Sequence, residues 1–397
     1  MGADTVTGPV IRIGPNELHS ANPEAYGEIY YTGSKFVKDP KVYKAFDQSS
    51  SSFGQTNAED AKRRREQLGP LFSRGAILRI EGILQEKVDR LVERITLGSE
   101  NSPVNLFLAF RAASMDIIMS YCFAESFDAL ETPGFDYPVL TSILNSITVI
   151  PLLVYFPFLV PILGTGPPRV LKWTAPMLNG YFDLFEHFSI RIAEAWADPA
   201  RLSWQDHVTV FQKLLDCPEN ERPTKRSLMD EAVTLLGAGT ETTGGTLTTA
   251  IYHIFTNSSV LERLRLEIDS AWPNDGTNLK YRDLERLDYL AAVIKVSVRC
   301  ADGVVTPMPR VVPSEVTICG FNVPPQVSAF EGKVVPLLNG SQTTVSAGST
   351  FVHRNPKLYP SPYEFRPERW LDPDMKDIES RFFVPFSKGP RSCLGVK

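Results

Sequence analysis

Hydrophobic residues recur at helical spacing along much of the chain. Between residues 77 and 95, isoleucine, leucine and valine return every three or four positions, which is the pattern of an amphipathic helix. Similar patterns predict helices over residues 109–123, 175–196, 260–272 and 290–300. Helices are therefore expected to dominate the fold.

The longest helical pattern covers residues 227–255 and would form a helix of about 40 Å, long enough to cross a whole domain. Ser227 and Asp230 stand at capping-box spacing at its start. Ser259 and Glu262 stand at the same spacing before the next helix. These pairs predict where the two helices begin.

Strand patterns are short and few. Residues 9–46 alternate brief β-like runs with turn residues, and residues 311–325 have the pattern of a hairpin. A proline-rich coil over residues 356–385 leads to the end of the chain, and no internal repeat or linker divides the sequence. We predict a single domain over residues 1–397, mainly α with small β-sheets (α+β).

One apolar window, residues 147–163, reads "ITVIPLLVYFPFLVPIL". It contains Pro151, Pro157 and Pro161, and proline removes backbone donors and breaks helices, so the window is a poor membrane span. Two interpretations follow. A buried loop with helix ends is favoured over a loop that dips into a membrane surface.

Composition narrows the class of protein. A hydrophobic content of 43% with 10% aromatic residues indicates a globular chain. The net charge of -5, without a basic stripe, gives no reason to expect a nucleic-acid partner. Five scattered cysteines suit a reducing compartment rather than a disulfide framework. Residues 1–30 hold no apolar run that could anchor the chain, so a soluble or peripheral protein is expected.

Candidate chemistry first appears inside the long helix. Four glycines lie between residues 237 and 245, and each costs about 1 kcal/mol relative to alanine in a helix interior. Close helix packing or a kink would explain glycines alone. Glu241 and Thr242 add an acid and a hydroxyl, so a groove with a proton relay for dioxygen activation is the sharper interpretation. A satisfied surface glutamate is the alternative.

A second candidate site is the loop "FSKGPRSCLG" near the end of the chain. A lone cysteine is usually a small buried hydrophobe. Here the spacing is highly specific, and it comprises Phe386, Gly389, Arg391, Cys393 and Gly395. Gly389 permits a tight turn, and Gly395 permits close approach of a following element.

Together with "GPVIRIGPNELH", "AGTETT" and "FRPERW", this loop makes the chain similar to the cytochromes P450, haem-thiolate monooxygenases, of the filamentous-fungal secondary-metabolism type. The resemblance implies a P450 fold with haem b, and Cys393 as the thiolate ligand of its iron. It also implies that Phe386 packs beside the sulfur and that Arg391 holds a haem propionate.

The resemblance extends to the distal side of the haem. It implies that Ala238 and Gly239 border the distal pocket, and that Glu241 and Thr242 deliver protons there. Arg310, in "PMPRVVP", matches a second propionate-binding arginine.

Arg65, in "AKRRREQLGPLFS", matches a third propionate-binding arginine. The aromatic or histidine expected four residues earlier is Ala61, which implies weaker anchoring of the haem on that side. The alternative is that Arg65 belongs to a solvated basic cluster over residues 62–65.

Departures from the family concern the core and the ends of the chain. Arg299 and Arg369 match two structural arginines, but the glutamate that should pair with them is Val296, which predicts a buried pair of cations without an anion. The family's N-terminal anchor and the helix after the cysteine loop are expected to be absent.

Residues 327–342 form an insertion foreign to the family pattern. The insertion begins with valine, whose codons start with GT, and ends with glutamine, for which CAG is a codon, as an intron would. A retained intron is favoured, and a genuine surface insertion is the alternative.

The resemblance implies insertion of one oxygen atom from O₂ into a lipophilic intermediate of terpenoid, polyketide or indole type. NADPH–cytochrome P450 reductase would supply electrons, and cytochrome b5 is a further candidate partner. The full-length family sits on the cytosolic face of the endoplasmic reticulum membrane. This chain is expected to be cytoplasmic or peripheral, with membrane contact through residues 147–163.

Two alternative functions compete with oxygen insertion. A non-catalytic, truncated or mis-spliced chain with impaired haem binding follows from the departures, which predict little activity for these 397 residues as purified. Rearrangement or dehydration without external oxygen is disfavoured by Glu241 and Thr242, since such chemistry has less need of a proton relay. The spectrum of the reduced, carbon monoxide-bound chain would separate an active enzyme from an impaired one.

Overall fold

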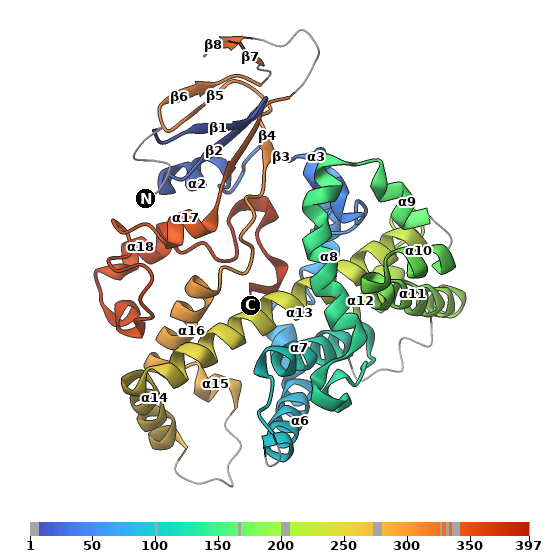
Figure 1. Ribbon diagram of the computed structural model, residues 1–397, viewed down its shortest axis with the longest axis vertical. Coiled ribbons are helices and arrows are strands. Elements are labelled where there is room, and N and C mark those ends of the chain that lie inside the picture. The colour runs from blue at the N-terminus through green and yellow to red at the C-terminus, as the bar shows by residue number, and fades with distance from the viewer. Residues whose placement is uncertain are drawn as a thin grey trace. The chain divides into compact units, whose positions relative to one another are not determined.

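Helices dominate the computed structural model, which confirms a mainly α fold with small sheets (Figure 1). The structure describes residues 8–99, 102–165, 168–199, 207–272, 280–325, 328–330, 333–335 and 342–396. The chain divides into two compact units. We call Met1–Asp39 with Thr246–Cys393 the sheet unit, and Pro40–Gly245 with Leu394–Lys397 the helical unit.

The sheet unit is built on a five-stranded sheet of order β1-β2-β9-β4-β3. Its strands are β1 Ile11–Gly14, β2 Glu17–Ser20, β3 Val37–Lys38, β4 Arg310–Val311 and β9 Thr344–Ala347. β2 and β9 run parallel, with Leu18 opposite Val345, and the other pairs are antiparallel. Two hairpins complete the strands: β5 Val316–Ile318 with β6 Phe321–Val323, and β7 Ser328–Phe330 with β8 Lys333–Val335.

Helices of the sheet unit cover two buried clusters. They are α2 Pro23–Ile29, α14 Ser258–Ala271, α15 Tyr281–Leu284, α16 Asp288–Ala301, α17 Ser349–His353 and α18 Met375–Phe382. One cluster joins α2 to the sheet through Tyr26, Ile29 and Val345. The other joins α14 and α16 through Leu264 and Val296.

The helical unit contains the other helices. They are α3 Pro40–Tyr43, α4 Ala58–Leu68, α5 Arg74–Arg79, α6 Glu81–Ser99, α7 Leu106–Phe123, α8 Pro138–Tyr155, α9 Leu159–Thr165, α10 Pro168–Thr174, α11 Asn179–Ala197, α12 Val210–Leu215 and the greater part of α13 Lys225–Thr256. α7 is buried over most of its length, because alanine, methionine and aromatic residues lie on nearly all of its faces.

The predicted helices are present, with corrections to their bounds. The pattern over residues 77–95 is divided between α5 and α6, with Ile80 between them. α13 begins at Lys225 rather than Ser227, because Thr224 Oγ1 accepts the Ser227 amide and Ser227 is engaged elsewhere. α14 is capped by Asn257, whose side chain accepts the Val260 amide, rather than by Ser259. The hairpin predicted over residues 311–325 is confirmed as β5 and β6.

The insertion over residues 327–342 lies largely outside the described residues. Within it, the described strands β7 and β8 form an antiparallel pair of three residues each. The retained intron over residues 327–342 stays a prediction.

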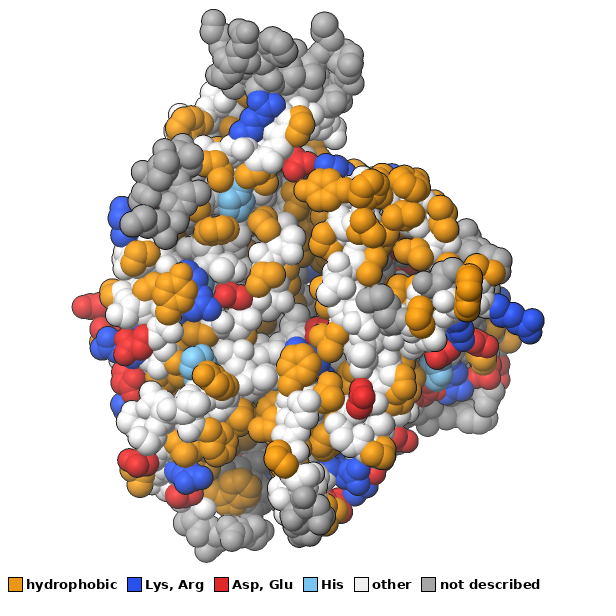
Figure 2. All heavy atoms as spheres, viewed as in Figure 1, with side chains coloured by type: hydrophobic (Ala, Val, Ile, Leu, Met, Phe, Trp, Pro, Cys, Tyr) orange, Lys and Arg blue, Asp and Glu red, His pale blue; other side chains and the backbone are white. Residues whose placement is uncertain are grey.

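The interpretation of residues 147–163 as a buried loop is wrong. Pro151 lies inside α8, and several large apolar side chains from the second half of α8 to α9 are exposed, Tyr155 to 74% and Phe158, between the two helices, to 62%. Figure 2 shows hydrophobic side chains gathered over this region, at the upper right of the view. Pro133–Tyr155 and the mostly buried α7 are long and apolar enough to span a membrane, by length and composition only.

Candidate functional site

The cysteine loop is a tight, defined turn. The Cys393 amide donates to the Phe386 carbonyl at 2.8 Å and closes the loop around the 3₁₀ turn Gly389–Arg391. Gly389 has φ +73°, and a Cβ atom there would lie 2.5 Å from the Tyr31 carbonyl oxygen. Only glycine satisfies both conditions. The Cys393 side chain at the end of the loop is exposed.

Tyr30 and Tyr31 link this loop to Arg310. Arg310 on β4 is buried, and its guanidinium carbon lies 5.0 Å from the centre of the Tyr30 ring. The carbonyls of Tyr30 and Tyr31 pack against Gly389 from the other side. The structure therefore brings the predicted propionate arginine and the cysteine loop against one short segment, which sequence patterns did not single out.

The donor set of the loop suits a haem. A cysteine thiolate is a soft ligand, and Cys393 would hold haem iron and supply electron density to it. Across the described residues, no group of three or more histidine, cysteine or acidic side chains gathers as a separate metal site. The exposed sulfur of Cys393, at the end of a loop closed by its own amide, fits a thiolate-ligated haem.

Glu241, on α13, is not a surface residue. It is 12% exposed, and its Oε2 accepts a hydrogen bond of 2.9 Å from Nε of Arg111, which is 8% exposed, on α7. Burial raises the pKa of Glu241, and the bond from Arg111 opposes that rise. Its Oε1 is buried without a hydrogen-bond partner among the described residues. The alternative of a satisfied surface glutamate is therefore wrong.

Thr242 donates a hydrogen bond from Oγ1 to the carbonyl of Ala238, at 2.7 Å. This bond to the residue four positions earlier is a common arrangement for threonine in a helix. The bond orients the Thr242 hydroxyl toward the preceding turn of α13, which contains Ala238 and Gly239.

The glycines of α13 have different surroundings. A Cβ at Gly239 would lie 2.9 Å from Ile118 Cγ1, and a Cβ at Gly244 would lie 2.6 Å from Arg111 Cγ. A Cβ at Gly237 would meet nothing within 4 Å. Close packing of α13 against α7 thus explains Gly239 and Gly244, while a border on the distal pocket stays a prediction for Ala238 and Gly239.

The basic cluster of α4 is not uniformly solvated. Arg64 is buried and donates to Glu231 at 2.9 Å and to Ser227 at 2.8 Å. Glu231 also accepts from the amide and hydroxyl of Ser52. This network, which we call the Glu231 network, fixes α4 against the start of α13. Arg65 lies next to it at intermediate exposure, and its role at a propionate stays a prediction.

Arg299 and Arg369 form the buried pair that the sequence predicted, around the ring of Tyr359. Their guanidinium carbons lie 5.2 Å and 6.0 Å from the centre of that ring. Their hydrogen bonds go to the carbonyls of His353, Pro360, Pro362 and Glu364 and to the sulfur of Cys300, none of which is a carboxylate. Burial lowers the pKa of both guanidiniums. Val296 is fully buried one turn before Arg299.

The predicted site residues are shared between the two units. The sheet unit holds Arg299, Arg310, Arg369, Phe386, Gly389, Arg391 and Cys393. The helical unit holds Arg65, Ala238, Gly239, Glu241, Thr242 and Gly395. Sequence reasoning missed Arg111 and Glu231, since each partner lies more than a hundred residues away along the chain.

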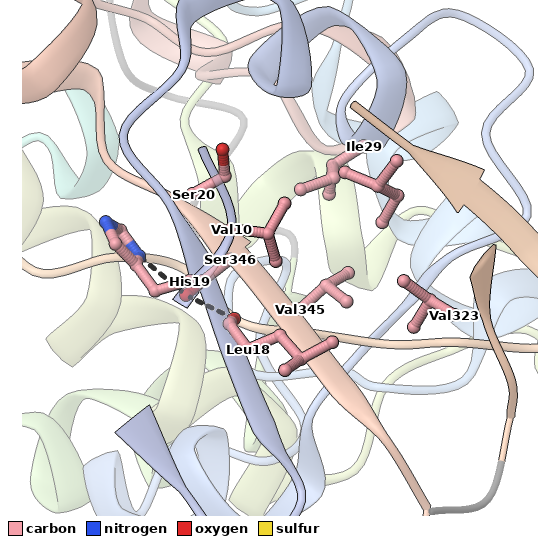
Figure 3. A pocket seen from close by; sticks show the side chains of 9 residues that line it. Val10, Leu18, His19, Ser20, Ile29, Val323, Val345 and Ser346 are labelled. Carbon is pink, nitrogen blue, oxygen red and sulfur yellow. Dashed lines mark hydrogen bonds between the residues drawn. The ribbon is translucent and has the colours of Figure 1, made fainter. Parts of the chain in front are cut away.

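A small pocket in the sheet unit is separate from these residues. Figure 3 shows it between β2, β9 and α2, lined by apolar side chains such as Leu18, Ile29 and Val345. His19 Nδ1 and Ser346 Oγ are hydrogen-bonded at its edge, 3.0 Å apart. The cavity has room for about one water molecule, so it is no substrate site.

Comparisons with known proteins show the family to which the chain belongs. Residues 8–397 match the family model described as Cytochrome P450. The chain is 34% identical to the cytochrome P450 monooxygenase macH of Penicillium terrestre, over 98% of this chain and 74% of the relative. It is 32% identical to the N-acetyltryptophan 6-hydroxylase ivoC of Emericella nidulans, with 98% and 74% covered. It is also 32% identical to the conidiogenone synthase PchP450 of Penicillium rubens, with 98% and 75% covered.

Proposed function

The chain belongs to the cytochrome P450 family and is a haem monooxygenase by descent, and we propose that it inserts oxygen into a lipophilic secondary-metabolite intermediate with electrons from NADPH–cytochrome P450 reductase. The observation that carries the proposal is the closed loop at Cys393. Its Gly389 turn and its amide bond to Phe386 present a single exposed cysteine sulfur.

Residues on the proximal side would bind and orient the haem. Cys393 would ligate the iron as thiolate, with Phe386 beside the sulfur. Arg310, Arg391 and Arg65 would hold the propionates through charge-assisted hydrogen bonds. The haem, when bound, supplies the iron centre at which dioxygen is activated.

Protons would come from α13. Glu241 is an acid whose pKa burial raises, so it can hold a proton closer to neutral pH than an exposed glutamate can. Thr242 carries a hydroxyl that can both accept and donate, and it follows Glu241 directly in the helix. We assign Glu241 as the reservoir of protons and Thr242 as the group that passes them on.

The substrate class is proposed as lipophilic, of terpenoid, polyketide or indole type. An indole-type substrate is supported by one relative, named as an N-acetyltryptophan 6-hydroxylase. Cytochrome b5 is proposed as a second electron donor. The exposed apolar side chains of α8 and α9 support contact with the cytosolic face of the endoplasmic reticulum membrane.

A second candidate, a family member with impaired haem retention, is favoured by the arginine pair. Among the described residues, the hydrogen-bond acceptors of the buried Arg299 and Arg369 include no carboxylate, and such a site would destabilise the sheet unit that carries Cys393. Under this candidate the chain keeps the ligand but holds the haem at less than full occupancy.

Reconstitution with the reductase, NADPH and ¹⁸O₂ tests the proposed function on a panel of terpenoid, polyketide and indole compounds. We expect a product that carries one labelled oxygen atom. Glu241→Gln should lower product formed per NADPH consumed by at least about tenfold and raise hydrogen peroxide, because its amide supplies no proton. The exposed Glu262→Gln on α14 is the matched control and should behave as the unaltered chain.

Product without labelled oxygen would contradict oxygen insertion. Unchanged coupling in Glu241→Gln would remove Glu241 from the relay while leaving the monooxygenase assignment intact.

A further inference from the structure

We propose that Arg111 is a positioning residue for proton delivery, which fixes the orientation and ionisation of the Glu241 carboxylate from the neighbouring helix. The proposal rests on the proposed function of Glu241. It is carried by the 2.9 Å bond from Arg111 Nε to Glu241 Oε2, between two side chains that are both almost fully buried. Both residues lie in the helical unit.

Arg111 is itself held rigidly. Its Nη1 donates to the carbonyl of Phe107 at 3.1 Å, and its guanidinium carbon lies 3.7 Å from the centre of the Phe107 ring. Phe107 is one turn earlier on α7, so the guanidinium plane is set by its own helix. A guanidinium fixed in this way can hold the carboxylate in one orientation.

That orientation distinguishes the two oxygens of Glu241. Oε2 is occupied by Arg111, whereas Oε1 is buried and has no hydrogen-bond partner among the described residues. A buried carboxylate oxygen without a hydrogen-bond partner lowers the stability of the fold, so its presence calls for a functional explanation. We therefore assign Oε1 as the oxygen that takes up and releases the proton, and Oε2 as the anchor.

Gly244 makes the arrangement possible. A Cβ there would lie 2.6 Å from Cγ, 3.0 Å from Cα and 3.1 Å from the amide nitrogen of Arg111. Two of these atoms belong to the backbone of α7, so any larger residue would push the helices apart at the position of Arg111. Gly244 thereby lets Arg111 reach Glu241, which lies one turn earlier on α13.

Electrostatics give the proposal a readout other than turnover. Among the described residues, the influences on the pKa of Glu241 are burial, which raises it, and Arg111, which lowers it. Removing the cation leaves burial unopposed, so Glu241 should protonate at higher pH. An adjacent opposite charge typically changes a carboxyl pKa by about 1–3 units.

The test uses Arg111→Met, Arg111→Lys and Gly244→Ala, with Gly237→Ala as the matched control on the same helix. Infrared difference spectra against Glu241→Gln follow the protonated carboxyl of Glu241 as pH is varied, with or without haem. In Arg111→Met we expect its midpoint to rise by at least about one pH unit. Coupling of NADPH to product should fall as in Glu241→Gln.

The other variants separate charge from geometry. Arg111→Lys should restore much of the midpoint but little of the coupling, because a flexible ammonium lacks the fixed plane of the guanidinium. Gly244→Ala should shift both the infrared midpoint and the coupling toward those of Arg111→Met, although it removes no charged group. Gly237→Ala, whose Cβ meets open space, should leave both unchanged.

An unchanged midpoint in Arg111→Met and Gly244→Ala would overturn the proposal, as would loss of coupling at an unchanged midpoint, which indicates a merely structural arginine. If Glu241→Gln itself kept full coupling of NADPH to product, Glu241 would not belong to the proton relay. The infrared midpoint would then still decide whether Arg111 governs the carboxylate.

Discussion

Val296→Glu is expected to raise the free energy of unfolding by about 2–3 kcal/mol, rather than to disrupt the core as a buried acid ordinarily would. Val296 is fully buried one turn before Arg299, so a carboxylate there lies on the same face of α16 as that guanidinium. Arg299 is 0% exposed, and the acceptors of Arg299 and Arg369 are backbone carbonyls and a sulfur. A carboxylate between two such cations would supply the missing counter-charge.

Urea denaturation followed by tryptophan fluorescence measures this gain. Val296→Gln is the matched control, since it has nearly the same shape as glutamate but no charge, and it should lower stability by burying an amide in an apolar cluster. A loss of stability in both variants would mean that the carbonyls alone satisfy the arginine pair. An equal gain in both would exclude charge as the cause.

Glu231→Ala should lower the free energy of unfolding by about 3–5 kcal/mol. The change leaves Arg64 as a buried cation without its 2.9 Å partner and removes the acceptor of the Ser52 amide and hydroxyl. Several elements of the helical unit would loosen together, because the Glu231 network joins α4, α13 and the segment at Ser52.

The control for this prediction is Glu66→Ala on α4. Glu66 faces Lys62 at 3.8 Å, with both side chains largely exposed, so its loss should cost less than about 1 kcal/mol. Both variants are compared by the same urea titration. A cost for Glu231→Ala as small as that for Glu66→Ala would contradict the assignment of a buried, coupled ion pair.

Local patterns predicted the parts of this molecule that depend on neighbouring residues. The helix at residues 227–255 followed from its periodicity, and the turn at Gly389 followed from glycine in a specific loop. The anion-free pair of Arg299 and Arg369 followed from the resemblance to the cytochromes P450, whose pattern places a glutamate where this chain has Val296, one turn before Arg299.

Contacts between distant segments could not be predicted from sequence patterns. Arg111 and Glu241 are 130 residues apart, and Arg64 and Glu231 are 167 apart, so no spacing rule joins them. The predicted cap at Ser227 failed for the same reason, since tertiary partners occupy its hydroxyl.

The apolar window was misread because proline was treated only as a helix breaker. α8 accommodates Pro151 near its end and exposes apolar side chains of its second half, while its first turns are buried. Burial of such a face depends on what packs against it, and that information is not contained in the window itself.

The reduced, carbon monoxide-bound absorption spectrum of the expressed chain, recorded beside that of Cys393→Ser, tests the central claim that Cys393 makes this chain a haem-thiolate enzyme. We predict a Soret band at the wavelength that gives the cytochromes P450 their name, at less than full haem occupancy, and its loss in Cys393→Ser. Val296→Glu should increase its intensity without moving it. A band elsewhere, or the same spectrum with and without the Cys393 sulfur, would contradict the assignment.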